Sequence, residues 1–186
     1  MSDVVAVSGN PRLGSRTHQV GLRIARRVAD ELGLSDSITE LEVIRYADGL
    51  FSWGDQRPEG LTAALDGLRH ARLAVIATPV YKAGYTGLLK SFLDHFQAGE
   101  LSSVVAIPVV VAGSPAHTFV GDLYLRPLLT EIGAVVPTPA FTVSEGQLDG
   151  LDEVVGRWTD RHLDALGRQL GSDTTGQVKV ATSAGR

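Results

Sequence analysis

The chain has 186 residues, a net charge of −4 and no cysteine. This length suits one domain with a sizeable core. The lack of cysteine excludes disulfides, thiolate catalysis and cysteine-ligated iron–sulfur clusters, and a pI of about 5.7 without a basic stripe argues against a nucleic-acid partner.

The chain enters an apolar strand almost at once, with no basic segment followed by an apolar core. No signal peptide is therefore apparent, and the apolar runs are too short to cross a bilayer. We expect a cytoplasmic protein that makes no membrane contact. The five histidines lack the spacing of metal ligands, so we expect no metal site.

Apolar runs alternate with helical patterns along the chain. The strand-like runs are Val4–Val7, Ile38–Ile44, Leu73–Thr78, Val104–Ala112 and Val135–Val143. The helical patterns are Thr17–Leu32, Leu61–Ala71, Thr86–Phe96, Gly121–Ile132 and Leu151–Leu170. Near-continuous apolar strands between helices predict a parallel sheet covered on both faces. The fold class is therefore α/β, a three-layer sandwich over residues 1–170, and residues 171–186 are expected to form a disordered tail.

A loop rich in phosphate-binding groups follows the first strand. Residues 8–17 read Ser-Gly-Asn-Pro-Arg-Leu-Gly-Ser-Arg-Thr and precede the first helix. A phosphate monoester needs several converging donors, and a helix N-terminus adds free N–H groups to the hydroxyls and guanidiniums. The dinucleotide and Walker spacings are both absent. The loop predicts a site for a terminal phosphate, with an ordinary polar strand–helix loop as the alternative.

Two later loops also stand out. Thr-Pro-Val-Tyr-Lys-Ala-Gly-Tyr-Thr-Gly at 78–87 follows the third strand, and Ala-Gly-Ser-Pro-Ala-His at 112–117 follows the fourth. In a five-stranded parallel sheet of order 2-1-3-4-5, both loops lie beside the phosphate loop at one edge. The glycines, proline and tyrosines of the first of them suit a flat aromatic ring held by backbone amides.

The motifs at 8–17 and 78–90 together resemble the NAD(P)H-dependent FMN reductases. The closer resemblance is to the flavin reductases that serve alkanesulfonate-type monooxygenases, and it covers roughly residues 3–170. It implies a flavodoxin-like fold, FMN as the flavin, and NADPH or NADH as the hydride donor. It also implies a homodimer or homotetramer and a flavin-dependent monooxygenase as partner.

The resemblance also implies the residues of the site. Those that would hold the phosphate are Ser8, Arg12, Ser15, Arg16 and Thr17. Those that would line the isoalloxazine are Pro79, Val80, Tyr81, Lys82 and Ala83, and those that would close its other side are Gly113, Ser114 and His117. No side chain is assigned as a catalytic acid or base, since the cofactors carry the hydride transfer.

The fourth helix departs from the family pattern. The alkanesulfonate reductases carry an inserted tyrosine soon after an aspartate, a feature associated with flavin release. Here Asp122 is followed by Leu123, and Tyr124 comes one place later, which leaves the flavin affinity open. Pro127 predicts a distortion of this helix, because proline lacks an amide proton.

Aromatic and apolar side chains suggest where subunits would meet. Phe92, Phe96, Leu123 and Tyr124 on the third and fourth helices are more apolar than a solvated helix requires, so we expect subunit contacts there. In the loop at 47–60, Phe51 and Trp53 are expected to pack on the sheet, with a pocket cover or a subunit contact as the alternative.

Two other functions remain open. A flavodoxin-type electron carrier would hold FMN permanently, but such carriers tend to be strongly acidic and a net charge of −4 is mild. A quinone or azo-dye reductase with bound FMN would share the same fold and site, because the final acceptor touches few residues.

Overall fold

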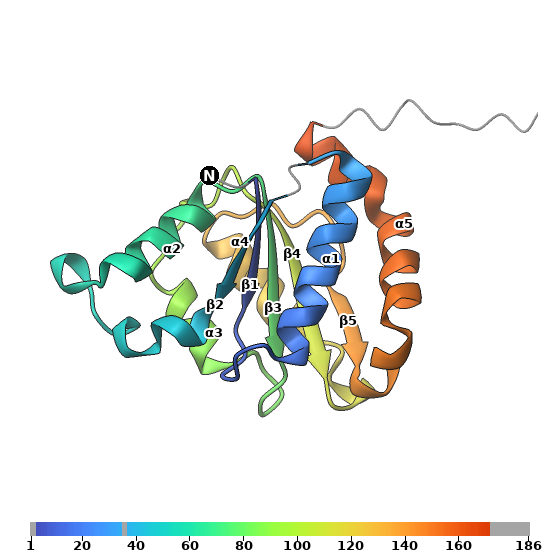
Figure 1. Ribbon diagram of the computed structural model, residues 1–186, viewed down its shortest axis with the longest axis horizontal. Coiled ribbons are helices and arrows are strands. Elements are labelled where there is room, and N and C mark those ends of the chain that lie inside the picture. Colours follow the sequence, from blue (N-terminus) through green and yellow to red (C-terminus); the bar gives the residue numbers. More distant parts are fainter. Residues whose placement is uncertain (1–2, 35–36, 172–186) are drawn as a thin grey trace, which may run out of the picture.

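A five-stranded parallel sheet forms the centre of the protein (Figure 1). The computed structural model describes residues 3–34 and 37–171. The strands are β1 (Val4–Ser8), β2 (Ile38–Glu42), β3 (Leu73–Pro79), β4 (Val105–Ala112) and β5 (Phe141–Ser144), in the order 2-1-3-4-5. The expected flavodoxin-like sandwich is confirmed. The expected tail at 171–186 lies, apart from Gly171, outside the described residues.

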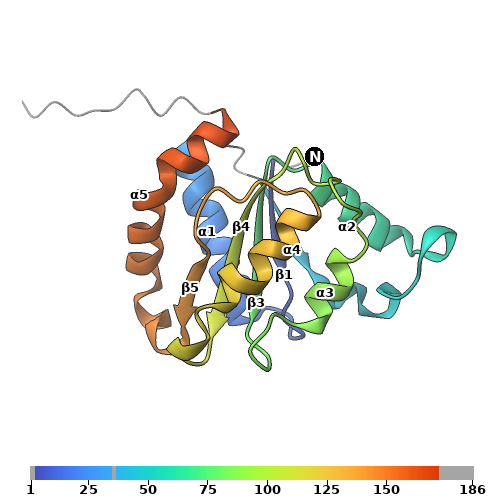
Figure 2. The same ribbon diagram turned by 180° about the vertical axis from the view of Figure 1, so that it is seen from behind.

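Helices cover both faces of the sheet (Figure 2). Helices α1 (Arg16–Leu32) and α5 (Leu151–Leu170) pack on one face. Helices α2 (Glu59–Arg69), α3 (Gly87–Leu93) and α4 (Arg126–Glu131) pack on the other. Every residue of β1, β3 and β4 is buried, as a sheet covered on both faces requires.

Short helical turns complete the connections. They are η1 (Val43–Gly49), η2 (Gly54–Gln56), η3 (Pro115–His117), η4 (Gly121–Leu125) and η5 (Glu145–Gly150). Four of them are 3₁₀ helices, whereas η4 is a π-helix in which the Arg126 amide donates to the Gly121 carbonyl, five residues back. The expected distortion beside Pro127 is therefore present. A side chain at Gly121 would clash with Ala140 at 2.4 Å, so this wide turn lies directly against the chain before β5.

The fifth strand begins later than the apolar pattern predicts. The expected strand was Val135–Val143, but only Val135 bridges to β4, through Val105, before the ladder resumes at Phe141. Pro137 and Pro139 lie between them and cannot donate to a ladder. Arg126 instead donates to the carbonyls of Val136 and Thr138, so α4 fixes this segment.

Two expectations about aromatic side chains are wrong. Phe92 on α3 and Phe96 just after it are buried in the core rather than presented to a second subunit, since both pack with the apolar residues that cover this face of the sheet. Phe51 does not pack on the sheet and is 81% exposed, while Trp53 stacks on His95 with ring centroids 4.4 Å apart. Leu123 and Tyr124, by contrast, are exposed on η4.

Candidate functional site

The three unusual loops lie together at the carboxyl edge of the sheet, below the arrowheads in Figure 1. The register of β1 with β3, and of β3 with β4, brings the ends of these strands side by side. A cleft of about 370 Å³ opens there. Its lining residues come from the first loop, the ends of β3 and β4, and η5: Asn10, Arg12, Leu13, Ser15, Arg16, Thr17, Pro79, Tyr81, Val111 and Glu145.

The loop after β1 presents donors toward this cleft. Ser15 is the N-cap of α1, and its Oγ accepts from the His18 amide at 3.2 Å. The two amides before it, at Arg16 and Thr17, have no acceptor within the helix, so they remain available to an anion. Asn10 ties the two ends of the loop together, since its Oδ1 accepts from the Arg12 amide at 2.9 Å and its Nδ2 donates to Thr17 Oγ1 at 3.0 Å.

A carboxylate from β2 holds the middle of the same loop. Glu42 is buried, and its Oε2 accepts from the Gly14 amide at 2.6 Å while its Oε1 accepts from Arg45 at 3.1 Å. Gly14 has a φ of 60°, a left-handed conformation that favours glycine. Glu42 on β2, itself held by Arg45 on η1, therefore fixes the shape of the loop before any ligand binds.

The loop after β3 is a tight turn with an unusual backbone. The Tyr81 amide donates to the Gly84 carbonyl at 2.9 Å, and the Gly84 amide donates to the Tyr81 carbonyl at 3.1 Å. Between them, Lys82 and Ala83 have φ values of 52° and 59°. Two successive left-handed residues form a type I′ geometry that normally selects Asn and Gly, so this turn is strained. Strain of this kind is often concentrated at functional sites.

The two loops are joined at their bases. Thr86, the N-cap of α3, donates through its Oγ1 to the Gly9 carbonyl at 2.6 Å and through its amide to Thr78 Oγ1 at 3.2 Å. A side chain at Gly9 would meet Leu89 at 2.5 Å, so only glycine permits this close packing. The walls of the cleft are thus fixed relative to each other by buried contacts.

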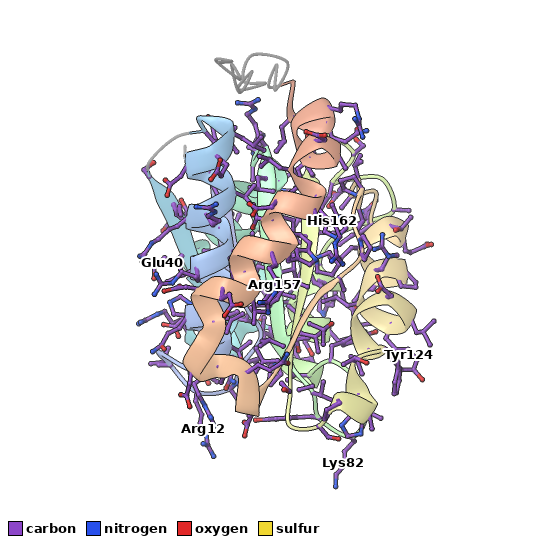
Figure 3. All side chains as sticks on the ribbon, turned by 90° about the vertical axis from the view of Figure 1, so that its right-hand side faces the viewer. Arg12, Glu40, Lys82, Tyr124, Arg157 and His162 are labelled. Atoms are coloured by element: carbon purple, nitrogen blue, oxygen red, sulfur yellow. The ribbon has the colours of Figure 1, made fainter. Side chains whose placement is uncertain are left out.

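The structure brings together about half of the expected site residues. Those that line the cleft are Arg12, Ser15, Arg16, Thr17, Pro79 and Tyr81. Lys82 and Ala83 are exposed beyond it, and Figure 3 shows Lys82 pointing outward at the same end of the molecule as Arg12.

The remaining expected residues lie next to the cleft without lining it. Ser8 is buried at the end of β1, where its hydroxyl has no partner among the described residues. Val80 packs against a small apolar cluster of Val110, Ala112 and Val120. Gly113, Ser114 and His117 lie on the loop after β4. Ser114 caps η3, and the His117 ring contacts Phe119 with centroids 6.4 Å apart.

Four lining residues were missed from the sequence: Asn10, Leu13, Val111 and Glu145. Asn10 and Leu13 stand inside the loop motif, and an Asn-Pro pair is a turn signal that pointed to Asn10. Val111 reads as one more buried strand residue. Glu145 carries no local signal, because it is 129 residues from Arg16, which it contacts only in the folded protein.

The two walls of the cleft differ in character. The wall from the first loop carries two arginines and two hydroxyls beside a helix N-terminus, whereas the wall from β3 and β4 presents Pro79, Tyr81 and Val111. A cationic wall next to an apolar, aromatic one fits a flat ring system that bears a phosphate. Within the described part of the chain, no group of three or more His, Cys, Asp or Glu residues could hold a metal, and no helix could span a membrane.

Comparison with known proteins agrees with this chemistry. A family model for NADPH-dependent FMN reductases matches residues 2–147. The chain belongs to this family. It is 32% identical to an FMN reductase (NADPH) of Pseudomonas aeruginosa over 78% of each chain, and 31% identical to the NADH-dependent FMN reductase SfnE of Pseudomonas putida over 72% of each chain.

A solved structure gives the same result for the fold of this FMN reductase family member. The apo form of an NADH:FMN oxidoreductase, EmoB, superimposes with a TM-score of 0.72 at 30% identity, covering 92% of this chain and 90% of that one. The resemblance noted in the sequence is thereby confirmed.

Proposed function

We propose that the protein binds FMN in the cleft at the carboxyl edge of the sheet and reduces it with NADPH or NADH. The observation that carries this proposal is the pairing of a cationic, hydroxyl-bearing wall with an apolar, aromatic one. Family membership supports the same reaction. The names of the relatives include both pyridine nucleotides, so the proposal covers both.

In this proposal the phosphate of FMN lies at the start of α1. Arg12 and Arg16 supply positive charge, Ser15 and Thr17 supply hydroxyl donors, and the first amides of the helix complete the set. Ser8 at the end of β1 would add a further hydroxyl donor, since its buried Oγ has no partner among the described residues. The Glu42 and Asn10 contacts keep these donors in place, so binding requires little rearrangement of the backbone.

The flavin ring would lie against the segment from Pro79 to Ala83, with Gly113, Ser114 and His117 closing its other side. When bound, FMN accepts a hydride from the nicotinamide. The chain's contribution is to orient the ring, to exclude water from it, and to present backbone N–H groups to the negative charge that develops. The exposed Lys82 adds positive charge near the approach of the pyridine nucleotide.

We further propose that reduced FMN leaves for a partner monooxygenase, in the cytoplasm, as in the flavin-supplying reductases that the sequence motifs resemble. We also propose a homo-oligomer. A groove of about 510 Å³ between α3 and η4–α4 includes the exposed Leu123 and Tyr124 beside Leu93 and Pro127. Exposed apolar side chains around a groove of this kind favour contact with another subunit.

The test is the oxidation of NADPH and of NADH by the purified protein, with and without added FMN. Oxidation that rises and saturates with free FMN is the expected result. No oxidation by a protein that retains FMN would favour an electron carrier. Fast oxidation that needs only a quinone, with FMN retained, would favour a quinone reductase. Sedimentation of a 19.7 kDa monomer would contradict the proposed oligomer.

A further inference from the structure

One acidic side chain stands among the donors of the candidate phosphate site. Glu145, the first residue of η5, lines the cleft, and its Oε1 is 3.1 Å from the Nη2 of Arg16. It is the one carboxylate among the lining residues. A carboxylate that forms an ion pair with a phosphate-binding arginine neutralises the positive charge that the ligand would bind.

We propose that Glu145 competes with the phosphate of FMN for Arg16, and so weakens FMN binding enough for the flavin to leave after reduction. The inference rests on the proposed function, because it takes the cleft as the FMN site. Under this proposal Glu145, which lies outside the motifs at 8–17 and 78–90, lowers the affinity for FMN.

The pair is poorly explained as a support of the fold. Both side chains are more than half exposed, and exposed ion pairs contribute little to folding stability. Each residue is also positioned without the other. Arg16 is the first residue of α1 and follows the N-cap Ser15. The start of η5 is held by a contact between Ser144 and Gln147, in which the Gln147 Oε1 accepts from the Ser144 amide at 3.0 Å. The side chains therefore remain free to exchange partners.

The second acid at the loop shows the contrast. Glu42 is buried and pairs with a backbone amide of the loop and with Arg45, which is not a lining residue. Glu42 shapes the loop and leaves both lining arginines free, whereas Glu145 occupies one of them. Among residues 3–34 and 37–171, no ion pair involves Arg12. The phosphate would therefore bind Arg12 directly, but it would have to displace Glu145 from Arg16.

The charges of the two anions determine how Glu145 should affect the Kd of FMN. The phosphate of FMN carries a charge near −1.5 to −2 at neutral pH, as other phosphate monoesters do. It therefore binds Arg16 more strongly than a single carboxylate does, but binding must separate the pair and leave Glu145 beside a second anion. Removing the carboxylate charge relieves both costs, and for partly exposed groups we expect about a tenfold tighter complex.

The experiment is a titration of FMN and of riboflavin, which lacks the phosphate, into the full chain, followed by quenching of flavin fluorescence. The variant is Glu145→Gln, which keeps the size of the side chain and removes its charge. We expect the Kd of FMN to fall about tenfold and the Kd of riboflavin to stay within about twofold. Stopped-flow displacement should show slower FMN release.

Glu31→Gln is the matched control. Glu31 is also a carboxylate paired with an arginine, Arg27 at 2.8 Å, but it lies near the opposite end of α1 from Arg16. This variant makes the same change in net charge and should leave both Kd values unchanged. Glu145→Ser provides a second variant should the glutamine protein fold poorly, and the thermal shift caused by saturating FMN provides a second measurement.

A double variant tests the route through Arg16. With Arg16→Ala in place, Glu145→Gln should tighten FMN by less than about threefold, since the contested cation is gone. A full tenfold gain in that background would overturn the competition and leave only direct repulsion. An unchanged FMN Kd in Glu145→Gln, with wild type still preferring FMN to riboflavin, would overturn the role of Glu145 alone. If wild type bound both flavins equally, the phosphate site and this inference would both be wrong.

Discussion

The loops after β1 and β3 contribute to the same cleft, yet they are held in different ways. The β1 loop takes its shape from side chains, with Glu42 bound to the Gly14 amide and Asn10 bound to Thr17. The turn from Tyr81 to Gly84 takes its shape from its own backbone and carries two left-handed residues. In the proposed complex, the phosphate would meet donors whose positions depend on contacts with other elements, whereas the ring would meet a local, strained turn of the backbone. Mutations in the two loops should therefore have separable effects.

The largest effect is expected at Arg16. In Arg16→Ala the phosphate loses a charge-assisted bond, roughly 1.5–3 kcal/mol, and FMN binding should weaken by one to two orders of magnitude. Riboflavin binding should not change, because riboflavin has no phosphate. The control is Arg23→Ala, which removes an exposed arginine of the same helix that pairs with Asp152. An equal loss of affinity for FMN and riboflavin would show that Arg16 does not act through the phosphate, and that the two loops do not have separate roles.

Gly84 tests the ring side of the comparison. A Cβ at this position would meet only the Tyr81 carbonyl oxygen at 3.8 Å, an ordinary contact, so Gly84→Ala should fold normally. If the ring approaches this backbone, the added methyl group displaces it and turnover should fall about tenfold. The melting temperature and the rate of NADPH oxidation with FMN are the two measurements. Unchanged turnover would show that no ligand approaches the backbone at Gly84.

Glu42 tests whether the phosphate loop depends on outside support. Glu42→Ala removes the acceptor of the Gly14 amide and should cost about 1 kcal/mol of folding stability, since water can reach the exposed amide. We expect FMN binding to weaken about fivefold and riboflavin binding to stay the same. In Arg45→Ala the Gly14 contact remains, so FMN binding should change less. Urea denaturation and flavin titration measure the two effects.

Ala83 tests the strain in the turn. Glycine tolerates a φ of 59°, so Ala83→Gly should raise the free energy of unfolding by about 0.5–1 kcal/mol. The same substitution at Ala63, an exposed position within α2, should lower it by about 1 kcal/mol. Opposite signs in urea denaturation would locate the strain at the turn. A loss of stability at both positions would mean that the turn is not strained.

The smallest effect lies outside both loops. Burial, followed by the nearby Arg57, lowers the pKa of His95 below its usual value. The unfolded chain therefore takes up the proton first as the pH falls, and stability should decline as the pH drops below about 6.5. His95→Gln should show a weaker decline. Some dependence should remain, because burial also lowers the pKa of His162. Denaturation curves at neutral and mildly acidic pH provide the measurement.

Much of this protein could be predicted from the sequence alone. Apolar runs and helical periods are local properties, so they indicated five strands and the main helices, although β5 begins later than its apolar run. The strand order belongs to the flavodoxin-like fold that the resemblance implied, and the structure confirms it together with the place where the loops meet. The motifs at 8–17 and 78–90 determined the family, and six of the expected site residues line one cleft. Pro127 likewise predicted a distortion of the fourth helix, and a π-turn lies directly before it.

Only the tertiary structure decided the contacts between distant residues. Glu145 meets Arg16 across 129 residues and Glu42 meets Gly14 across 28, and no local pattern records such pairs. It also decided which apolar side chains face outward: Phe92 turns to the core, while Leu123 stays exposed on a π-turn whose geometry shifts the helical face. Burial and pairing depend on what packs against a residue, and the chain brings those partners together only when it folds.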